Sequence, residues 1–380
     1  MIPPGLARAS GFYFFFFLAF GAQLPFWPLW LADRGLSAAE IGAFASTAVA
    51  LKVAMGFLVP LAADRAGAPR RALALLCALT ALVYLAHLGA RSPGALFIAT
   101  LAAAAAIAGI TPIADALTLR AAARGGFAYA TARSLGSIAF LIANILCGLA
   151  MTRHGADVAL WWIVVALLPC IWLGLKHPGG AGAPLPRPKL AEALALFGRP
   201  AILLTMLAGA SLQGAHAVLY TYGSIHWRAL GHDDATIGGL WAFAVLVEVL
   251  LMLSTGRGLI RRLGPAGAMA LAGAAGVLRW ALMAGDPGLV WLWPLQALHA
   301  LTFTAAYLGA VAMVERLAPA NLAATTQGLV GATGSGIVTA LAGLAAAAVY
   351  PAWGGGTYWI AAALSLSGLL ASLALRRAAR

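Results

Sequence analysis

Apolar runs of about 18 or more residues recur along the whole of this 380-residue chain. Each run is long enough to cross about 30 Å of hydrocarbon as an α-helix, which satisfies its own backbone N–H and C=O groups. Only 9% of the residues are charged, whereas soluble domains carry about 25%. We therefore predict an all-α integral membrane protein, with no stretch left over for a sizeable soluble domain.

The apolar runs divide the chain into about twelve predicted transmembrane helices. Their expected bounds are 10–32, 39–62, 71–90, 94–118, 129–151, 158–175, 200–225, 235–256, 265–284, 288–314, 322–349 and 355–375. The first run is too long for a signal-peptide core and lacks a clear cleavage site, so we expect it to remain as the first span. Most of its FYFFFFLAF stretch is expected to face lipid.

The basic residues are distributed unequally between alternate loops. Of the 24 Lys and Arg residues, 17 lie at the two ends of the chain and in the loops that follow even-numbered spans: Arg8, Arg65, Arg70, Arg71, Arg120, Arg124, Lys176, Arg187, Lys189, Arg199, Arg257, Arg261, Arg262, Arg316, Arg376, Arg377 and Arg380. Four lie on the opposite side: Arg34, Arg91, Arg153 and Arg228. The positive-inside rule then predicts an inner-membrane protein with both termini in the cytoplasm. The net charge of +13 is read as a topology signal and not as a nucleic-acid interface.

The two halves of the chain resemble each other. GLSAAEIG (35–42) and GHDDATIG (231–238) share four of eight residues at an offset of 196, and each begins a helix with a capping side chain. The Pro- and Gly-rich segment 176–199 is predicted to be a cytoplasmic linker between domains 1–175 and 200–380. A repeat of six plus six helices is the architecture of a rocking transporter that binds substrate near the midplane.

Several ionisable residues fall inside the predicted spans, where they usually mark ion pathways or substrate sites. Glu248 stands alone in AFAVLVEVLLML, and the repeat offset relates it to Lys52. Arg279 on the next helix is its expected partner, with His299 as a relay or a tuning group. The alternative is a static buried ion pair that only fixes helix packing.

Asp115 and Arg133 form a second candidate pair on adjacent helices, either for a polar part of the substrate or simply to tie the helices together. Pro112 is expected to bend the helix that carries Asp115. Lys52 has no nearby acid in sequence, which suits a carboxylate substrate; the alternative partners are Glu248 and Asp115 in the empty protein.

Polar and aromatic side chains share one helical face in two spans. Gln213, His216 and Tyr220 lie at i, i+3 and i+7 of one helix, and Gln296, His299, Phe303 and Tyr307 follow the same pattern in another. Such stripes suit a ring-bearing ligand, although packing is the commoner role of aromatic residues at this spacing. Gln23, before the LPFWP segment, is a further candidate for substrate binding.

We find no motif for an enzyme, a cofactor or a metal site. The chain lacks a phosphate-binding P-loop, so ATP is not expected to drive it. Its His, Asp and Glu residues are too dispersed for metal-ligand spacing. Cys77, Cys147 and Cys170 lie inside apolar runs and are interpreted as packing residues.

The segment ADRAGAPRRAL (63–73) resembles the cytoplasmic signature of the major facilitator superfamily. Asp64, Arg65, Gly67, Arg70 and Arg71 match it, while Pro60 replaces the leading glycine. Within the superfamily, FYFFFFLAFGAQLPFWPLWL, QGAHAVLYTYGSIHW, GVLRWALM and LQALHALTFTAAYLGA are similar to the phenylpropionate permease branch, which is related to lactose permease-type symporters.

The resemblance implies a twelve-helix fold, an inner-membrane location and proton symport. It assigns proton coupling to Glu248, Arg279 and His299, substrate binding to Asp115 and Arg133, and a gating role to the signature residues. The second acid that those symporters place after the histidine is absent, because Thr302 and Phe303 occupy that region. Glu248 would then carry the proton itself.

We therefore predict a monomeric proton-coupled symporter that imports a small organic solute, most favourably an aromatic or aryl-alkyl carboxylate. Its expected partners are the solute, protons and the bilayer. Alternatives are a nucleoside or sugar symporter, an exporter working by proton antiport, and a membrane scaffold or sensor that transports nothing.

Overall fold

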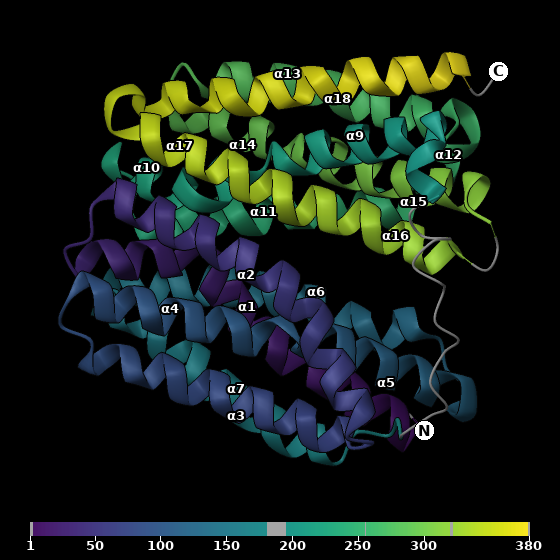
Figure 1. Cartoon of the computed structure of the whole chain (residues 1–380). Coiled ribbons are helices and arrows are strands. Elements are labelled where there is room, and N and C mark those ends of the chain that lie inside the picture. The colour runs from purple at the N-terminus through teal and green to yellow at the C-terminus, as the bar shows by residue number, and fades with distance from the viewer. Residues whose placement is uncertain (1–2, 181–194, 255, 320–321, 379–380) are drawn as a thin grey trace. The chain divides into compact units, whose positions relative to one another are not determined.

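The computed structural model describes residues 3–180, 195–254, 256–319 and 322–378, and the regular secondary structure in these ranges is helical. The first half contains α1 (Pro4–Asp33), α2 (Ala38–Arg65), α3 (Pro69–Ala86), α4 (Pro93–Ala108), α5 (Ile110–Gly125), α6 (Tyr129–His154) and α7 (Asp157–Leu175). The second half contains α9 (Pro200–Gly214), α10 (Ser224–Ala229), α11 (Asp234–Ser254), α12 (Gly256–Leu263), α13 (Pro265–Met283), α14 (Leu289–Ala297), α15 (Ala306–Leu317), α16 (Ala323–Gly331), α17 (Thr339–Trp353) and α18 (Tyr358–Ala378) (Figure 1). Short π-helical segments join some of these: η3 (Leu219–Gly223), η4 (Ala300–Ala305) and η6 (Ala332–Val338).

Eleven continuous helical segments among the described residues are long and apolar enough to cross a membrane. The last of them, Thr326–Arg377, has 52 residues and would extend about 78 Å at 1.5 Å per residue, more than twice the hydrocarbon thickness. It reverses at Gly354, whose φ of +51° is readily accessible only to glycine, so that α17 and α18 contact each other (Figure 1). This segment supplies two crossings, and the predicted twelve-helix membrane fold is confirmed.

The observed helix bounds differ from the prediction at two instructive places. The helix that carries Asp115 is interrupted at Gly109, between α4 and α5. Pro112 lacks the N–H that would bond the carbonyl of Ala108, which accounts for the predicted bend at this point. The basic segment expected as a loop after α11 is instead helical over Gly256–Leu263, which forms α12.

Contacts within the chain define two compact units, each with its own core. The first comprises residues 1–37, 47–185 and 227–242, and the second comprises 38–46, 186–226 and 243–380. The division follows the two halves of the sequence except at the mirrored segments 38–46 and 227–242, which group with the opposite half. The linker prediction of 176–199 lies largely outside the described residues, which resume at Ala195.

The same packing pattern occurs inside both units. In the first, α1 packs against α6 and α7, and α3 packs against α7. In the second, α9 packs against η6 and α18, and α13 packs against α18. Small residues allow the close approach: a Cβ at Gly21 of α1 would lie 2.8 Å from the Phe140 carbonyl oxygen of α6. This equivalence is what a repeated six-helix template requires.

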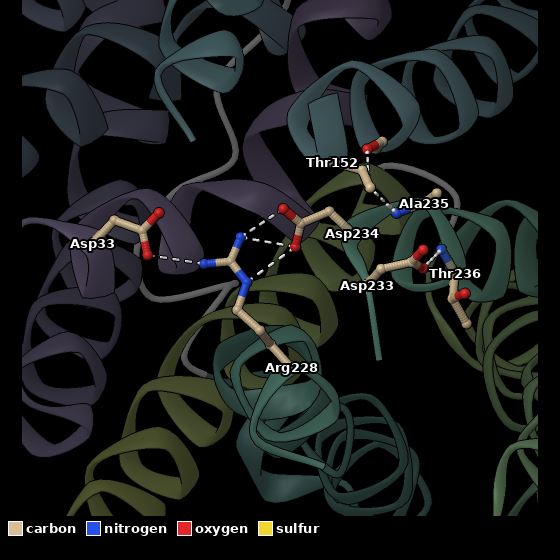
Figure 2. A network of polar contacts seen from close by, with 8 residues as sticks. Asp33, Thr152, Arg228, Asp233, Asp234, Ala235 and Thr236 are labelled. Atoms are coloured by element: carbon tan, nitrogen blue, oxygen red, sulfur yellow. Dashed lines mark hydrogen bonds and ion pairs between the residues drawn. The ribbon is translucent and has the colours of Figure 1, made fainter. Parts of the chain in front are cut away.

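A polar network occupies the end of the first unit where α1 terminates. Arg228 Nη2 lies 2.7 Å from both carboxylate oxygens of Asp234, and its Nη1 donates to Asp33 at 3.0 Å (Figure 2). The N-cap predicted at the start of α11 is present, since Asp233 Oδ1 accepts from the Thr236 N–H at 2.8 Å (Figure 2). These hydrogen bonds from Thr236 lower the pKa of the Asp233 carboxyl.

Candidate functional site

Six polar side chains of the second unit form a connected group, which we call the arginine cluster: His216, Glu248, Arg279, Gln296, His299 and Thr302. They come from the turn after α9, from α11, α13 and α14, and from the segment around η4. All six lie inside helical segments that are long and apolar enough to cross a membrane, where a polar group needs a protein partner or water.

Arg279 lies at the centre of the arginine cluster and is completely buried. Its Nη2 donates to Gln296 Oε1 at 2.6 Å, and its Nη1 lies 3.0 Å from Thr302 Oγ and 3.2 Å from His299 Nδ1. The guanidinium also packs over the Trp280 ring, 4.3 Å from its centroid. The Nε group has no hydrogen-bond partner among the described residues.

Glu248 contacts His299 and not Arg279. Its Oε2 lies 3.4 Å from His299 Nε2, and the Glu248 side chain keeps 16% of its exposure. The prediction of a direct Glu248–Arg279 ion pair is therefore wrong: within the described residues the histidine ring separates the two charges. Sequence spacing identified the three residues, but the order in which they contact each other depends on how their helices are rotated.

The hydrogen-bond geometry assigns the tautomer of His299. An arginine can only donate, so His299 Nδ1 must accept from Arg279. A neutral imidazole then carries its proton on Nε2, which faces the Glu248 carboxylate. His299 thus presents an N–H to Glu248 and is held in that orientation by Arg279.

The same argument fixes the other branch of the arginine cluster. His216 Nδ1 lies 3.2 Å from the Leu212 carbonyl oxygen and must donate, which leaves its Nε2 to accept. Thr302 Oγ accepts from Arg279, and its own O–H lies within donating distance of His216 Nε2, at 3.1 Å, and of the His299 carbonyl oxygen, at 3.3 Å. The chain of donors therefore begins at Arg279 and ends at Glu248 on one side and at a backbone carbonyl on the other.

The π-helical segments change which side chains share a face. Phe303 stacks on His299, with ring centroids 5.2 Å apart, and His216 stacks on Tyr220 at 5.8 Å. Tyr307, predicted to continue the His299 stripe, is instead 48% exposed. The intervening π turn of η4 inserts one residue and rotates the rest of the helix by about 100°, so that part of the prediction is wrong. Gln213 remains close, with its Nε2 3.5 Å from the Phe303 carbonyl oxygen.

A second group of polar residues lies in the first unit, and we call it the tyrosine–aspartate cluster: Tyr13, Phe17, Asp115, Tyr129 and Arg133. The Tyr13 hydroxyl donates to Asp115 Oδ1 at 2.5 Å, and the Tyr13 and Tyr129 rings meet edge to face at 6.4 Å. The Arg133 guanidinium lies 3.9 Å from the Phe17 ring centroid and 5.3 Å from that of Tyr13.

The expected Asp115–Arg133 ion pair does not form between these described residues. The Asp115 carboxylate instead accepts a hydrogen bond from Tyr13, and the Arg133 guanidinium packs on the rings of Phe17 and Tyr13. The expectation that FYFFFFLAF mostly faces lipid is wrong for Phe12, Tyr13 and Phe16, which are buried. The lone hydroxyl in this phenylalanine run was the signal that could have identified Tyr13.

Two other predicted substrate residues of the first unit have incomplete partners. Lys52 on α2 is half-buried and forms no ion pair within the described part of this unit. Gln23 Oε1 is buried without a hydrogen-bond partner among the described residues. The predicted substrate role of both residues stays a prediction.

The signature segment joins α2 to α3 through Gly67, whose φ is +63°. Arg70 donates from Nε to the Gly179 carbonyl at 2.5 Å and from Nη2 to that of Pro178 at 3.3 Å. Asp64, Arg65 and Arg71 are exposed and form no ion pair with a described residue. The predicted gating role of this segment stays a prediction, and the structure adds that Arg70 holds the chain that leaves α7.

His177 fixes the same departing segment. Its Nδ1 accepts from the Gly179 N–H at 3.2 Å, and its Nε2 lies 3.3 Å from Thr118 Oγ. Burial, together with the positive charge of Arg70, lowers the pKa of His177 to about 4. The ring is therefore neutral near pH 7.

No group of three or more His, Cys, Asp and Glu side chains in the described ranges is arranged to hold a metal ion. The three cysteines are buried and free.

Comparison with known proteins places these features in a family. Residues 6–361 match the model of the MFS_1 like family. The chain is 27% identical over 362 residues to the probable 3-phenylpropionic acid transporter of Escherichia coli (strain K12), covering 93% of each protein. Its fold is similar to that of the nucleoside transporter NupG (D323A mutant), with a TM-score of 0.83, 16% identity and 98% and 99% of the two chains covered.

The POT family transporter PepTSo is also similar in fold, with a TM-score of 0.76, 14% identity and 100% and 98% of the two chains covered. Low identity to these solved structures shows the fold alone, whereas the family match spans most of the chain. The protein is a multi-pass membrane transporter and not an enzyme, and it belongs to the MFS_1 like family of the major facilitator superfamily.

Proposed function

We propose that this transporter is a proton-coupled symporter and that Glu248 is the group that binds and releases the proton. The observation that carries the proposal is the Glu248–His299–Arg279 arrangement. A single partly exposed carboxylate faces an imidazole N–H, and the buried guanidinium behind the ring holds that N–H in place. Glu248 is the only carboxylate of the arginine cluster, so the proposed stoichiometry is one proton per solute.

The roles of the remaining predicted residues follow from this proposal. Arg279 and His299 position the proton-binding carboxylate. Lys52, Asp115, Arg133 and Gln23 contact polar groups of the solute, while Gln213, His216, Tyr220 and Phe303 line or support its ring. Asp64, Arg65, Gly67, Arg70 and Arg71 act in the conformational change.

An aromatic or aryl-alkyl carboxylate is the proposed substrate. Lys52 lacks an acidic partner in its own unit and would bind a carboxylate, and aromatic side chains surround both clusters. The E. coli relative is named as a probable transporter of 3-phenylpropionic acid, which supports the same class. A nucleoside is the second candidate, because the NupG transporter has a similar fold.

We further propose that the protein resides in the inner membrane as a monomer with both termini in the cytoplasm, and that domains 1–175 and 200–380 move as two six-helix bodies around the linker 176–199. The unequal distribution of Lys and Arg supports this orientation. Accessibility of single cysteines at residues 91 and 316 to an impermeant reagent in intact cells tests it: the first should react and the second should not.

The test of function uses purified protein in proteoliposomes with a pH indicator outside. Adding 3-phenylpropionate should make the external medium more alkaline as solute and proton enter together, and uridine and lactose should give no signal. Acidification would instead establish proton antiport, and a response to uridine alone would overturn the assigned substrate class.

The Glu248→Gln variant tests the coupling residue. One proton per solute gives about 1.4 kcal/mol per pH unit, which is about tenfold accumulation. Glu248→Gln should reduce this ratio to one while solute exchange continues, because the amide oxygen can still accept from His299. Glu315→Gln, the same change at an exposed carboxylate of α15, should leave accumulation tenfold. Uphill uptake by Glu248→Gln would refute the assignment.

A further inference from the structure

An apolar groove of about 560 Å³ lies on the first unit, between α1 and α7. Its walls are formed by Phe15 and Leu18 of α1 and by side chains of α7 from Val158 to Pro169, among them Trp161, Trp162 and Val165. The Trp162 indole N–H donates to the Leu18 carbonyl oxygen at 3.1 Å and so links α7 to α1 within the groove. None of the transport residues proposed above lines it.

One end of the groove is polar. His154 and Asp157 line it there, at the turn that joins α6 to α7. Asp157 Oδ1 accepts hydrogen bonds from Arg34 and, at 2.8 Å, from the Trp30 indole N–H. The second oxygen, Oδ2, has no partner among the described residues, and the Arg34 and Asp157 side chains are 37% and 56% exposed. At the mouth, the exposed carboxylate of the lining residue Asp157 is therefore paired with the exposed guanidinium of Arg34, which lies beside the groove.

The dimensions of the groove match one leaflet of a bilayer. Asp157 and Pro169 are twelve positions apart on α7, which corresponds to about 18 Å along the helix. Half of the hydrocarbon thickness is about 15 Å. The polar mouth lies at the end of its helices, where lipid headgroups are found, and tryptophans occupy the neighbouring positions as they commonly do at that depth.

We propose that this groove is a binding site for a glycerophospholipid whose headgroup carries both a phosphate and an amine. One acyl chain lies between α1 and α7. The phosphate is attracted to Arg34, and the ammonium group pairs with the free oxygen of Asp157. The phosphate of a lipid without an amine would also be attracted to Arg34, but its negative charge would then lie beside the Asp157 carboxylate with no ammonium group between them. The site should therefore prefer lipids that carry an amine over lipids that do not.

The test measures lipid that stays bound to the intact protein. Purified full-length protein is incubated with equal amounts of phosphatidylethanolamine and phosphatidylglycerol of the same chain length, and retained lipid is counted by native mass spectrometry. We expect phosphatidylethanolamine to be retained at least about threefold better. Equal retention, or a preference for phosphatidylglycerol, would overturn the proposal.

Two kinds of variant separate the acyl and headgroup contributions. Val165→Trp fills the groove at a side chain that is 60% exposed and should abolish retention. Leu168→Trp introduces the same side chain at a position that is 52% exposed on the same helix but outside the groove, and should retain lipid like the parent. Asp157→Asn should bind both lipids equally.

Thermal midpoints with and without lipid check that each variant is folded. Equal loss of lipid by both tryptophan variants, or unchanged retention by Val165→Trp, would show that the lipid binds elsewhere. Displacement by 3-phenylpropionate would assign the groove to the transported solute and would also overturn the proposal. None of these readouts depends on the proton-coupling assignment.

Discussion

Thr302 joins three helices of the second unit through one hydroxyl group. Its Oγ accepts from Arg279 Nη1 at 3.0 Å and lies 3.1 Å from His216 Nε2. Replacing it by valine keeps the shape of the side chain and removes both of these hydrogen bonds, together with the longer one, 3.3 Å, to the His299 carbonyl oxygen. Thr304, two residues later, provides the matched control, since its buried hydroxyl has no partner among the described residues.

The expected size of the effect follows from these two contacts. Hydrogen bonds between membrane helices contribute about 0.6 kcal/mol on average and up to about 1.7 kcal/mol. The bond from the charged Arg279 belongs at the upper end of that range. Thr302→Val should therefore lower the free energy of unfolding by about 1–3 kcal/mol. Thr304→Val removes an unsatisfied buried hydroxyl and should be neutral or slightly stabilising.

The assay is equilibrium unfolding of the purified protein in mixed micelles, followed by tryptophan fluorescence, for the parent, the two valine variants and Thr302→Ser. Serine keeps the hydroxyl and should recover most of the loss. If Thr302→Val is as stable as Thr304→Val, the hydroxyl does not link Arg279 to His216, and the donor order assigned to the arginine cluster is wrong.

Three further predictions concern the first unit. Tyr13→Phe removes the hydroxyl that donates to Asp115 and should weaken solute binding in a titration about tenfold, equivalent to about 1.4 kcal/mol. Phe14→Leu, on the same helix but outside the cluster, is the control and should bind like the parent. Unchanged affinity of Tyr13→Phe would show that its hydrogen bond to Asp115 does not contribute to solute binding. Because the pKa of His177 is lowered to about 4 from 6.5, its contribution to stability is complete above pH 6.5 and is lost as the pH falls toward 4, by about 3 kcal/mol. His177→Asn, which still accepts from Gly179, should flatten the dependence of unfolding free energy on pH between 4 and 6.5, and an unaltered slope would contradict the assignment. The lysine of Arg228→Lys cannot bind Asp234 through two nitrogens, so this variant should have a lower thermal midpoint, by an amount corresponding to about 1 kcal/mol and less at high salt. The same change at the exposed Arg153 should leave the thermal midpoint unchanged. Equal effects of the two variants would show that the Arg228 network does not stabilise the protein.

The signature segment between α2 and α3 shows which contacts a sequence motif can predict and which it cannot. Gly67 matched the signature by residue type, and its positive φ of +63° shows why a glycine suits the turn between α2 and α3. Arg70 matched the signature by residue type, but its partners proved to be the carbonyls of Pro178 and Gly179, more than 100 positions away in the chain. A local pattern can specify a turn because the turn is made by adjacent residues, whereas it cannot specify a partner that another helix brings into place.

The amino-acid sequence by itself determined where the chain crosses the membrane, where α11 begins with a cap, and which charged residues lie inside spans. These properties are local. In lipid each backbone polar group must be hydrogen-bonded within its own helix, so a span can be recognised from its own residues, and a charged residue inside it is evident because its neighbours are apolar. Only the tertiary structure decided that His299 stands between Glu248 and Arg279, that Tyr13 and not Arg133 contacts Asp115, and that a π turn carries Tyr307 away from the His299 face. Those outcomes depend on the rotation and packing of several helices at once, and a rotation of about 100° follows from a single inserted residue.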